Sequence, residues 1–158
     1  GKGSHKYENI RIGINGRLDT IQAAILLAKL SLFEEEVRLR QDVATRYNTR
    51  LRDCPGLVTP EIPAGYRSVW AQYSLMARDE KHRDSIMNKM QAAGIPTVIY
   101  YPRPLHLQGA FSFLGYRAGD FPVSEDCARR IFSLPMHPYL SEGDQDRIIA
   151  ALRDAAED

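Results

Sequence analysis

The chain has 158 residues, 44% of them hydrophobic, which is enough for about one domain with a real core. Its 21 basic and 20 acidic side chains nearly cancel, and no basic block carries interleaved aromatics, so nucleic acid and anionic membranes are poor default partners. No apolar run approaches the length of a bilayer span, and none follows the N-terminus as in a signal peptide. Cys54 and Cys127 share no metal or redox spacing, which predicts reduced thiols in a cytoplasmic protein.

The first predicted element is a glycine-punctuated loop over residues 1–18 that leads into an apolar helix. Asp19 is a favourable N-cap residue, and Gln22, three residues later, completes a capping-box-like pair. Asn15 and Arg17 therefore precede a helix N-terminus, where free amides and the helix dipole favour an anion such as a phosphate. The alternative is an ordinary turn with a solvated arginine, because Asn-Gly is a common turn dipeptide.

A long helix, straight or bent, is predicted over residues 19–52. Its first part, 19–33, carries apolar residues on nearly every face, which predicts burial from more than one side. It is either a core helix of this domain or a helix that packs between domains or against a second subunit. The second interpretation is favoured, because a domain of this length has little room to enclose such a helix. From Glu34 onward the apolar residues form a single stripe, and Cys54 with the following Pro-Gly ends the helix.

A small α/β layer is predicted after a proline- and glycine-rich loop at 57–67. Alternating residues predict a strand over 69–77, Asp79 can cap the next helix, and Gly94 ends that helix. A second strand is predicted over 97–100. This strand–helix–strand unit should be parallel with a right-handed crossover, whether the two strands are neighbours or another strand lies between them.

Two helices and a short strand complete the predicted layer. Ser124 is expected to cap a short helix through about Arg130, and residues 132–134 to form a third strand. Ser141 with Asp144 opens the last helix, whose buried stripe is Ile148, Ile149, Leu152 and Ala155. The predicted fold is therefore α/β, with helices on one face of a short sheet.

Few residues combine into a chemical site on spacing alone. His106 and His137 each occupy a proline-flanked turn, but no third ligand stands at a metal-binding spacing, so no metal site is predicted. Tyr100 and Tyr101 are adjacent, and in a strand they would point to opposite faces. One would then be a core residue, whereas the other could reach a ligand with its hydroxyl. No set of Ser/His/Asp or Cys/His residues can be assembled for nucleophilic catalysis.

Four blocks of the chain carry a resemblance. They are Gly13-Ile14-Asn15-Gly16-Arg17-Leu18-Asp19 with Gln22-Ala23-Ala24, Ser68-Val69-Trp70-Ala71-Gln72-Tyr73, Gly94-Ile95-Pro96-Thr97-Val98-Ile99-Tyr100-Tyr101-Pro102-Arg103-Pro104-Leu105-His106, and Ser133-Leu134-Pro135-Met136-His137-Pro138. In this order they resemble the C-terminal part of the DegT-type sugar-nucleotide aminotransferases, which use pyridoxal 5'-phosphate (PLP) and have the aspartate-aminotransferase fold.

The resemblance implies the small C-terminal domain of a fold type I PLP transferase, with a long N-terminal helix and a short sheet covered by helices. Residues 1–18 would lead from an N-terminal PLP domain that has no counterpart here. Residues 19–158, including the connecting helix 19–52, would form the small domain. The lysine that forms the Schiff base belongs to the absent domain, and no lysine of this chain matches its motif, so no catalytic residue is predicted here.

The resemblance also implies binding roles. Asn15 matches an asparagine that reaches across a dimer to the PLP phosphate, and Arg17 matches an arginine near the phosphates or sugar of the substrate. Tyr100, Tyr101 and His106 match the segment that lines the sugar-nucleotide pocket. The match is nearest to members that act on UDP-linked 3-oxo sugars, including 3-oxo-glucuronates, with glutamate as the amino donor.

We therefore predict the C-terminal domain of a homodimeric, cytoplasmic PLP-dependent transaminase. The full enzyme would aminate a nucleotide-linked keto-sugar in surface-polysaccharide or amino-sugar biosynthesis, whereas this fragment alone would be inactive. One alternative is a stand-alone, non-catalytic interaction module derived from the same fold. A remoter alternative is an unrelated α/β binding domain.

Overall fold

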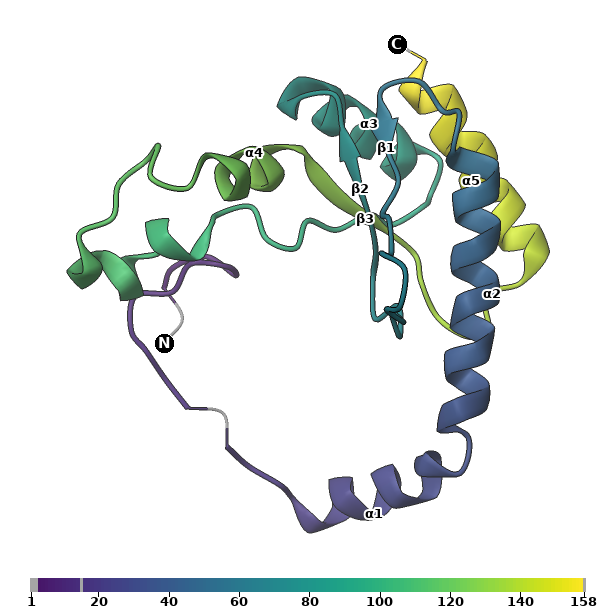
Figure 1. Cartoon of the computed structure of the whole chain (residues 1–158), viewed down its shortest axis with the longest axis horizontal. Helices are drawn as coiled ribbons and strands as arrows, with labels where there is room; N and C mark the ends of the chain where they lie inside the picture. The colour runs from purple at the N-terminus through teal and green to yellow at the C-terminus, as the bar shows by residue number, and fades with distance from the viewer. Residues whose placement is uncertain (1–2, 15, 158) are drawn as a thin grey trace.

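The computed structural model describes residues 3–14 and 16–157, and its centre is a small antiparallel sheet (Figure 1). The strands are β1 (Leu57–Val58), β2 (Tyr73–Ala77) and β3 (Ile131–Leu134), in the order β1-β2-β3. Both neighbouring pairs are antiparallel, and Tyr73 lies opposite Leu134 in the register of β2 and β3.

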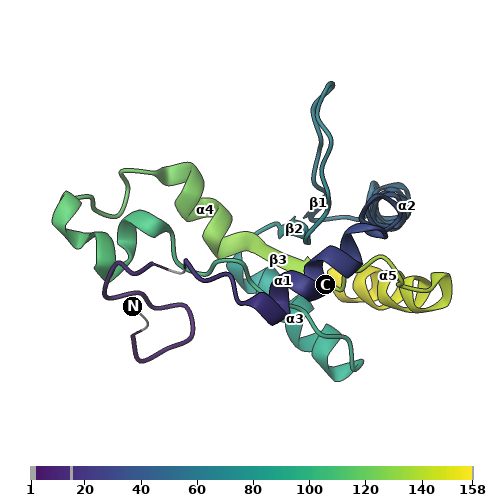
Figure 2. The same cartoon turned by 90° about the horizontal axis from the view of Figure 1, so that it is seen from below.

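Five α-helices and two short 3-10 helices are found in the described part of the chain. They are α1 (Thr20–Leu30), α2 (Phe33–Leu51), α3 (Glu80–Ala92), η1 (Leu105–Leu107), η2 (Gly109–Leu114), α4 (Pro122–Arg130) and α5 (Glu142–Ala156). Helices α2 and α5 lie side by side in both views (Figures 1 and 2), and α3 packs against α5 and β2. None of the helices in the described residues is long and apolar enough to cross a membrane.

The core lies between the sheet and helices α2, α3 and α5. Its fully buried side chains come from all of these elements and include Tyr47, Leu51, Tyr73, Leu75, Ile86, Met90, Phe132, Ile149 and Leu152. Because one cluster of buried apolar residues connects the helices to the strands, residues 33–156 fold around a single core. The predicted α/β class is confirmed.

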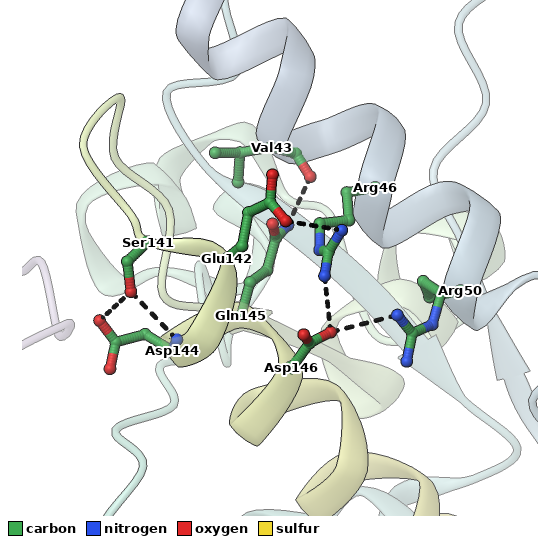
Figure 3. Close-up of polar contacts among 8 residues, drawn as sticks. All are labelled: Val43, Arg46, Arg50, Ser141, Glu142, Asp144, Gln145 and Asp146. Atoms are coloured by element: carbon green, nitrogen blue, oxygen red, sulfur yellow. Dashed lines mark hydrogen bonds and ion pairs between the residues drawn. The ribbon is translucent and has the colours of Figure 1, made fainter.

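Polar contacts fix α5 against α2 (Figure 3). Gln145 is buried, and its Nε2 donates a hydrogen bond of 2.7 Å to the backbone oxygen of Val43. Asp146 on α5 accepts from Arg46 at 2.8 Å and from Arg50 at 3.1 Å, both on α2. These contacts bridge positions about a hundred residues apart in sequence, and they set how α5 lies along α2.

The predicted helix 19–52 is not continuous, because a turn at Ser31 and Leu32 divides it into α1 and α2. Helix α1 contains no buried residue, and Leu27 is 71% exposed. The core-helix interpretation is therefore wrong for this chain. Asp19 does occupy the N-cap position of α1, but its side chain makes no capping hydrogen bond, so that part of the prediction is also wrong.

The strand predicted over 69–77 starts only at Tyr73, because the chain before it folds onto α2. Trp70 has a positive φ of 50°, and its indole donates a 3.0 Å hydrogen bond to Gln41. Its backbone oxygen accepts from Arg40 at 2.9 Å, so it is not free to form a sheet ladder. Residues 57–58, predicted as loop, instead pair with β2, and the connecting segment extends away from the sheet (Figure 2) before it returns along α2 at Ser68 and Trp70.

The predicted second strand is reduced to one antiparallel bridge between Val98 and Ser133. Because β2 and Val98 pair antiparallel with opposite edges of β3, they run parallel to each other with β3 between them. Of the two arrangements considered from sequence, the structure has the one with an intervening strand. Helix α4 begins at Pro122 with Phe121 at the N-cap, so Ser124 is not its cap.

The caps of the later helices agree with the sequence. Asp79 accepts from the amide of His82 at the start of α3, Gly94 has a φ of 70° after its end, and the Ser141 hydroxyl accepts from the amide of Asp144 at 3.1 Å. The N-termini of helices leave amides without intrahelical partners, and the side chains of Asp79 and Ser141 supply acceptors for them. Gly94 acts differently, because glycine adopts a positive φ after a helix end without steric cost.

We expect Ser141→Ala to lower the free energy of unfolding by about 1 kcal/mol, because it removes the acceptor at the start of α5. Asp19→Ala is the matched control at an N-cap whose side chain makes no capping bond, and it should change stability by less. Urea unfolding of both variants measures the difference. An equal loss of unfolding free energy in the two variants would contradict the assignment of a capping hydrogen bond to Ser141 and not to Asp19.

Candidate functional site

A pocket of about 490 Å³ brings together three segments that are far apart in sequence. The segments are residues 6–9 near the N-terminus, residues 100–108 between the sheet and η1, and residues 124–131 on α4 and at the start of β3. Its volume is within the range of small-molecule sites. Figure 1 shows the N-terminal loop lying beside the segment that carries η1 and η2.

Three tyrosines form an edge-to-face series along this pocket. The ring of Tyr7 lies 5.8 Å from that of Tyr101, and Tyr101 lies 6.0 Å from Tyr100, with interplanar angles near a right angle. The ammonium group of Lys6 stands 5.1 Å from the centre of the Tyr7 ring, and Arg103 also lines the pocket. The site therefore combines aromatic faces and hydroxyls with positive charge.

Tyr100 and Tyr101 both line the pocket, so the expectation that they point to opposite faces is wrong. That expectation required a strand, but the pairing with β3 is confined to Val98. The peptide bond between the two tyrosines is cis. Tyr101 is 61% exposed, so its ring and hydroxyl are accessible from solvent.

His106 is buried and does not line the pocket, although Leu105 before it does. Its Nε2 lies 3.0 Å from the carboxylate of Glu125 on α4, and its ring packs 4.7 Å from that of Phe121. The Glu125 carboxylate also accepts from the amide of Gly119 at 2.9 Å. His137 is exposed and does not line the pocket.

The hydrogen-bond donors around Glu125 affect its ionisation. The backbone amide of Gly119 makes the largest contribution to lowering the pKa of Glu125, followed by His106 and the amide of Phe121, while burial acts in the opposite direction. These donors all stabilise the charged carboxylate. Glu125 therefore joins the 115–121 loop, α4 and η1 through its ionised form.

Residues 16–18, just before the N-cap of α1, do not line the pocket. Asn15 lies outside the described residues. Arg17 is exposed, has no hydrogen-bond or ion-pair partner among the described residues, and does not line the pocket. Figure 1 shows this segment leading away from η1 and η2 towards α1. Tyr100 and Tyr101 therefore line one pocket, whereas neither His106 nor Arg17 lines it within one chain.

Helix α1 and the residues around it present a second feature, an exposed apolar hollow of about 590 Å³. Its apolar lining residues are Leu18, Ala23, Leu26, Leu27, Leu30 and Phe33. Exposed patches of this kind on a folded chain are typical of interaction surfaces.

Sequence reasoning missed several pocket residues, namely Lys6, Tyr7, Arg103 and Gln108, and it also missed Glu125, the partner of His106. Lys6 and Tyr7 lie about a hundred positions from the segment they face, and no periodicity connects two such loops. Gln108 stands two residues beyond the Tyr-Tyr-Pro-Arg-Pro-Leu-His block, so its proximity to that block was the available signal.

Comparisons with known proteins give a consistent result. A family described as the DegT/DnrJ/EryC1/StrS aminotransferase family matches residues 1–153. The chain is 44% identical, over 147 residues, to the UDP-2-acetamido-2-deoxy-3-oxo-D-glucuronate aminotransferase of Pseudomonas aeruginosa, covering 93% of this chain and 39% of the relative. The chain thus spans about two fifths of the length of the curated relatives it matches.

Two solved structures are similar along nearly all of the chain. A DegT DnrJ EryC1 StrS aminotransferase from Brucella abortus is 54% identical with a TM-score of 0.79, covering 98% of this chain and 40% of that one. DesV from S. venezuelae, solved in complex with a ketimine intermediate, is 31% identical with a TM-score of 0.84, covering 99% and 41%.

We expect Glu125→Gln to lower the melting temperature at neutral pH, because it weakens the bonds to Gly119, Phe121 and His106. The folded-state pKa of Glu125 is below the ordinary 4.5, so its stabilisation is present above that value and is lost as pH falls through the folded-state pKa. The gap between variant and parent should therefore shrink in acid. Melting curves between neutral and acidic pH measure it, with exposed Glu61→Gln as control. A gap that does not depend on pH would contradict this role.

Proposed function

Because this chain belongs to the DegT/DnrJ/EryC1/StrS aminotransferase family, we propose that it is the C-terminal small domain of a PLP-dependent nucleotide-sugar transaminase. The observation that carries the proposal is the pocket in which Tyr100 and Tyr101 meet, within a segment that resembles the family's sugar-nucleotide pocket. The stand-alone interaction module is not favoured, since the family match continues over residues 1–153.

In this proposal residues 1–18 lead from an N-terminal PLP domain, and residues 19–158 form the small domain. PLP, held by a lysine of that other domain, would supply the electron sink for moving an amino group from glutamate to the sugar carbonyl. This chain would supply binding contacts. The relative from Pseudomonas aeruginosa acts, by its name, on a UDP-linked 3-oxo-glucuronate, which supports a UDP-linked keto-sugar as the substrate class. A cytoplasmic location is part of the same proposal.

The residues before α1 fit a phosphate group. Asp19 leaves the first-turn amides of α1 without a side-chain acceptor, and Arg17 is exposed and unpartnered among the described residues. Amides at a helix N-terminus and a guanidinium are suitable donors to a phosphate dianion. Asn15, which stands between Gly13 and Arg17, is the proposed contact to the PLP phosphate.

The tyrosine pocket fits the other part of a sugar nucleotide. The hydroxyls of Tyr100 and Tyr101 can hydrogen-bond a sugar, and Lys6 and Arg103 on the same pocket provide positive charge for a pyrophosphate. His106 remains part of the proposal as a substrate contact. Since Glu125 engages its Nε2, such a contact has to use the ring atoms that Glu125 leaves free.

A homodimer accounts for the separation of Arg17 from the tyrosine pocket. Arg17 does not line the pocket of its own chain, so in this proposal a second copy brings it to the pocket of its partner. Helix α1 follows that segment directly and exposes apolar side chains. We therefore propose that α1 is covered in the dimer, by the partner or by the PLP domain.

The test of the cofactor contact is Asn15→Ala in the full-length protein. It should remove a charge-assisted hydrogen bond worth roughly 1.5–3 kcal/mol, which corresponds to a roughly ten- to hundredfold weaker hold on PLP. Dialysis after incubation with glutamate, followed by absorbance of the retained PLP, measures this loss, and exposed Asn88→Ala is the matched control. Formation of an amino sugar from the UDP-linked 3-oxo sugar is assayed in parallel. Parent-like PLP retention by Asn15→Ala would remove the phosphate role.

The test of the assembly is Leu27→Glu on α1. Leu27 lines the exposed apolar hollow, and a carboxylate there opposes burial in an interface. Sedimentation of the full-length protein should show the parent as a dimer and Leu27→Glu shifted towards monomer. Val123→Glu, at an exposed apolar position on α4, should leave the dimer intact. A dimer in both variants would place the interface elsewhere.

A further inference from the structure

Gln108 is a buried side chain that satisfies three backbone groups at once. It is 3% exposed and follows η1 directly. Its Oε1 accepts from the amide of Asn9 at 3.0 Å, and its Nε2 donates to the backbone oxygens of Tyr7 at 3.1 Å and Arg103 at 3.2 Å. Two of these bonds cross about a hundred residues of sequence, so Gln108 ties the N-terminal segment to the 100–108 segment.

Main-chain contacts strengthen the same junction. The amide of Ala110 donates to the backbone oxygen of Asn9 at 2.8 Å. A Cβ at Gly109 would lie 3.5 Å from that oxygen, so the two backbones pass at contact distance. The N-terminal segment is therefore held by hydrogen bonds on both sides of Asn9, and Gln108 is the side chain that supplies most of them.

The third wall of the pocket is attached through the neighbouring turn. His106, two residues before Gln108, contacts Glu125 on α4 at 3.0 Å. Residues 106 and 108 thus connect the 100–108 segment to α4 on one side and to the N-terminal segment on the other. Lys6 and Tyr7 come from the segment that Gln108 holds, and both face the tyrosine pocket.

We propose that Gln108 is a positioning residue for the tyrosine pocket, acting through the backbone of Tyr7 and Arg103 rather than by touching substrate. This inference rests on the proposed function, in which that pocket takes a UDP-linked keto-sugar. Without the Gln108 side chain, the backbone oxygen of Tyr7 loses the hydrogen bond that helps to hold the Tyr7 ring beside Tyr101. The backbone oxygen of Arg103 loses its hydrogen bond to Gln108 as well. The pocket then binds substrate more weakly, while the reacting groups on the PLP domain are unchanged.

Only an amide satisfies all three partners. A carboxylate at this position accepts from Asn9 but cannot donate to the oxygens of Tyr7 and Arg103, and methionine retains the length without either function. Gln108→Glu and Gln108→Met therefore remove different parts of the same junction. Gln91→Met, at an exposed position on α3, is the matched control.

The first measurement is amide hydrogen exchange of the full-length protein. In Gln108→Met the amides of Asn9 and Ala110 should exchange at least about tenfold faster, while Leu75 in β2 keeps its protection. In Gln108→Glu the Asn9 amide keeps its acceptor and should stay protected. Parent-like exchange at Asn9 in Gln108→Met would overturn the inference. If Gln108→Met does not fold, the kinetics of Gln108→Glu decide.

The second measurement is the split between KM and kcat with the UDP-linked 3-oxo sugar. We expect KM to rise about tenfold in both Gln108 variants with kcat within about twofold of the parent, as for loss of uniform binding. Tyr101→Ala is the reference. If Tyr101→Ala raises KM but neither Gln108 variant does, the inference on Gln108 is overturned and the proposed function stands. If Tyr101→Ala leaves KM unchanged, the proposed pocket itself is wrong, and the role of Gln108 in it is overturned as well.

Discussion

The packing of Tyr73 on β2 against Tyr47 on α2 is the contact on which the rest of the structure depends. Both rings are fully buried, 4.8 Å apart, and each hydroxyl has a defined acceptor. Tyr73 donates to Asn48 at 2.7 Å, and Tyr47 donates to the backbone oxygen of Pro135 at 3.0 Å. Burial raises the pKa of both tyrosines, which keeps them neutral and able to donate.

The tyrosine contact transmits order to the pocket through the sheet. Tyr73 starts the central strand, β2 pairs with β3, and Pro135 follows β3 directly. The other edge of β3 pairs with Val98, which stands two residues before Tyr100. Helix α4 ends at Arg130, directly before the first residue of β3. A rigid sheet therefore fixes where two of the three walls begin, but it does not reach the third, the N-terminal segment. Hydrogen bonds of Gln108 and the backbone of Asn9 make that last connection.

Predictability from the sequence followed the range of the interaction. Asp79, Gly94 and Ser141 act on amides or turns within a few residues, so their signals were local and the structure has them as expected. Asp19 has the right residue type at the right place but no bond, because residue type states what a side chain can do and not where it points. Trp70 belongs to an alternating pattern that predicted a strand. Its indole and backbone oxygen instead bind α2, and this tertiary contact outweighs the local preference for a strand.

The candidate site was only partly predictable for the same reason. Tyr100, Tyr101 and His106 were predicted together because they stand in one block of sequence that resembles the family's pocket segment. Their partners Lys6, Tyr7 and Glu125 come from other segments, and neither spacing nor composition relates them to that block. The order of β3 between β2 and Val98 is also a property of the folded sheet. The sequence did not decide whether the two predicted strands are neighbours or have a strand between them, because a parallel crossover is right-handed in both arrangements.

The exposed helix and the separated half-sites have one physical explanation under the proposed function. The buried side chains of residues 33–156 form one cluster, and α1 contributes no buried residue to it. Helix α1 therefore extends from the core with its apolar side chains exposed (Figure 1). An apolar helix in that position is costly in water unless another surface covers it. Arg17 stands two residues before the N-cap of α1, so under the proposed function a surface that covers α1 would also lie near Arg17. The contact that removes the helix from water would then also bring groups of another domain or another copy of the chain to the proposed phosphate contacts.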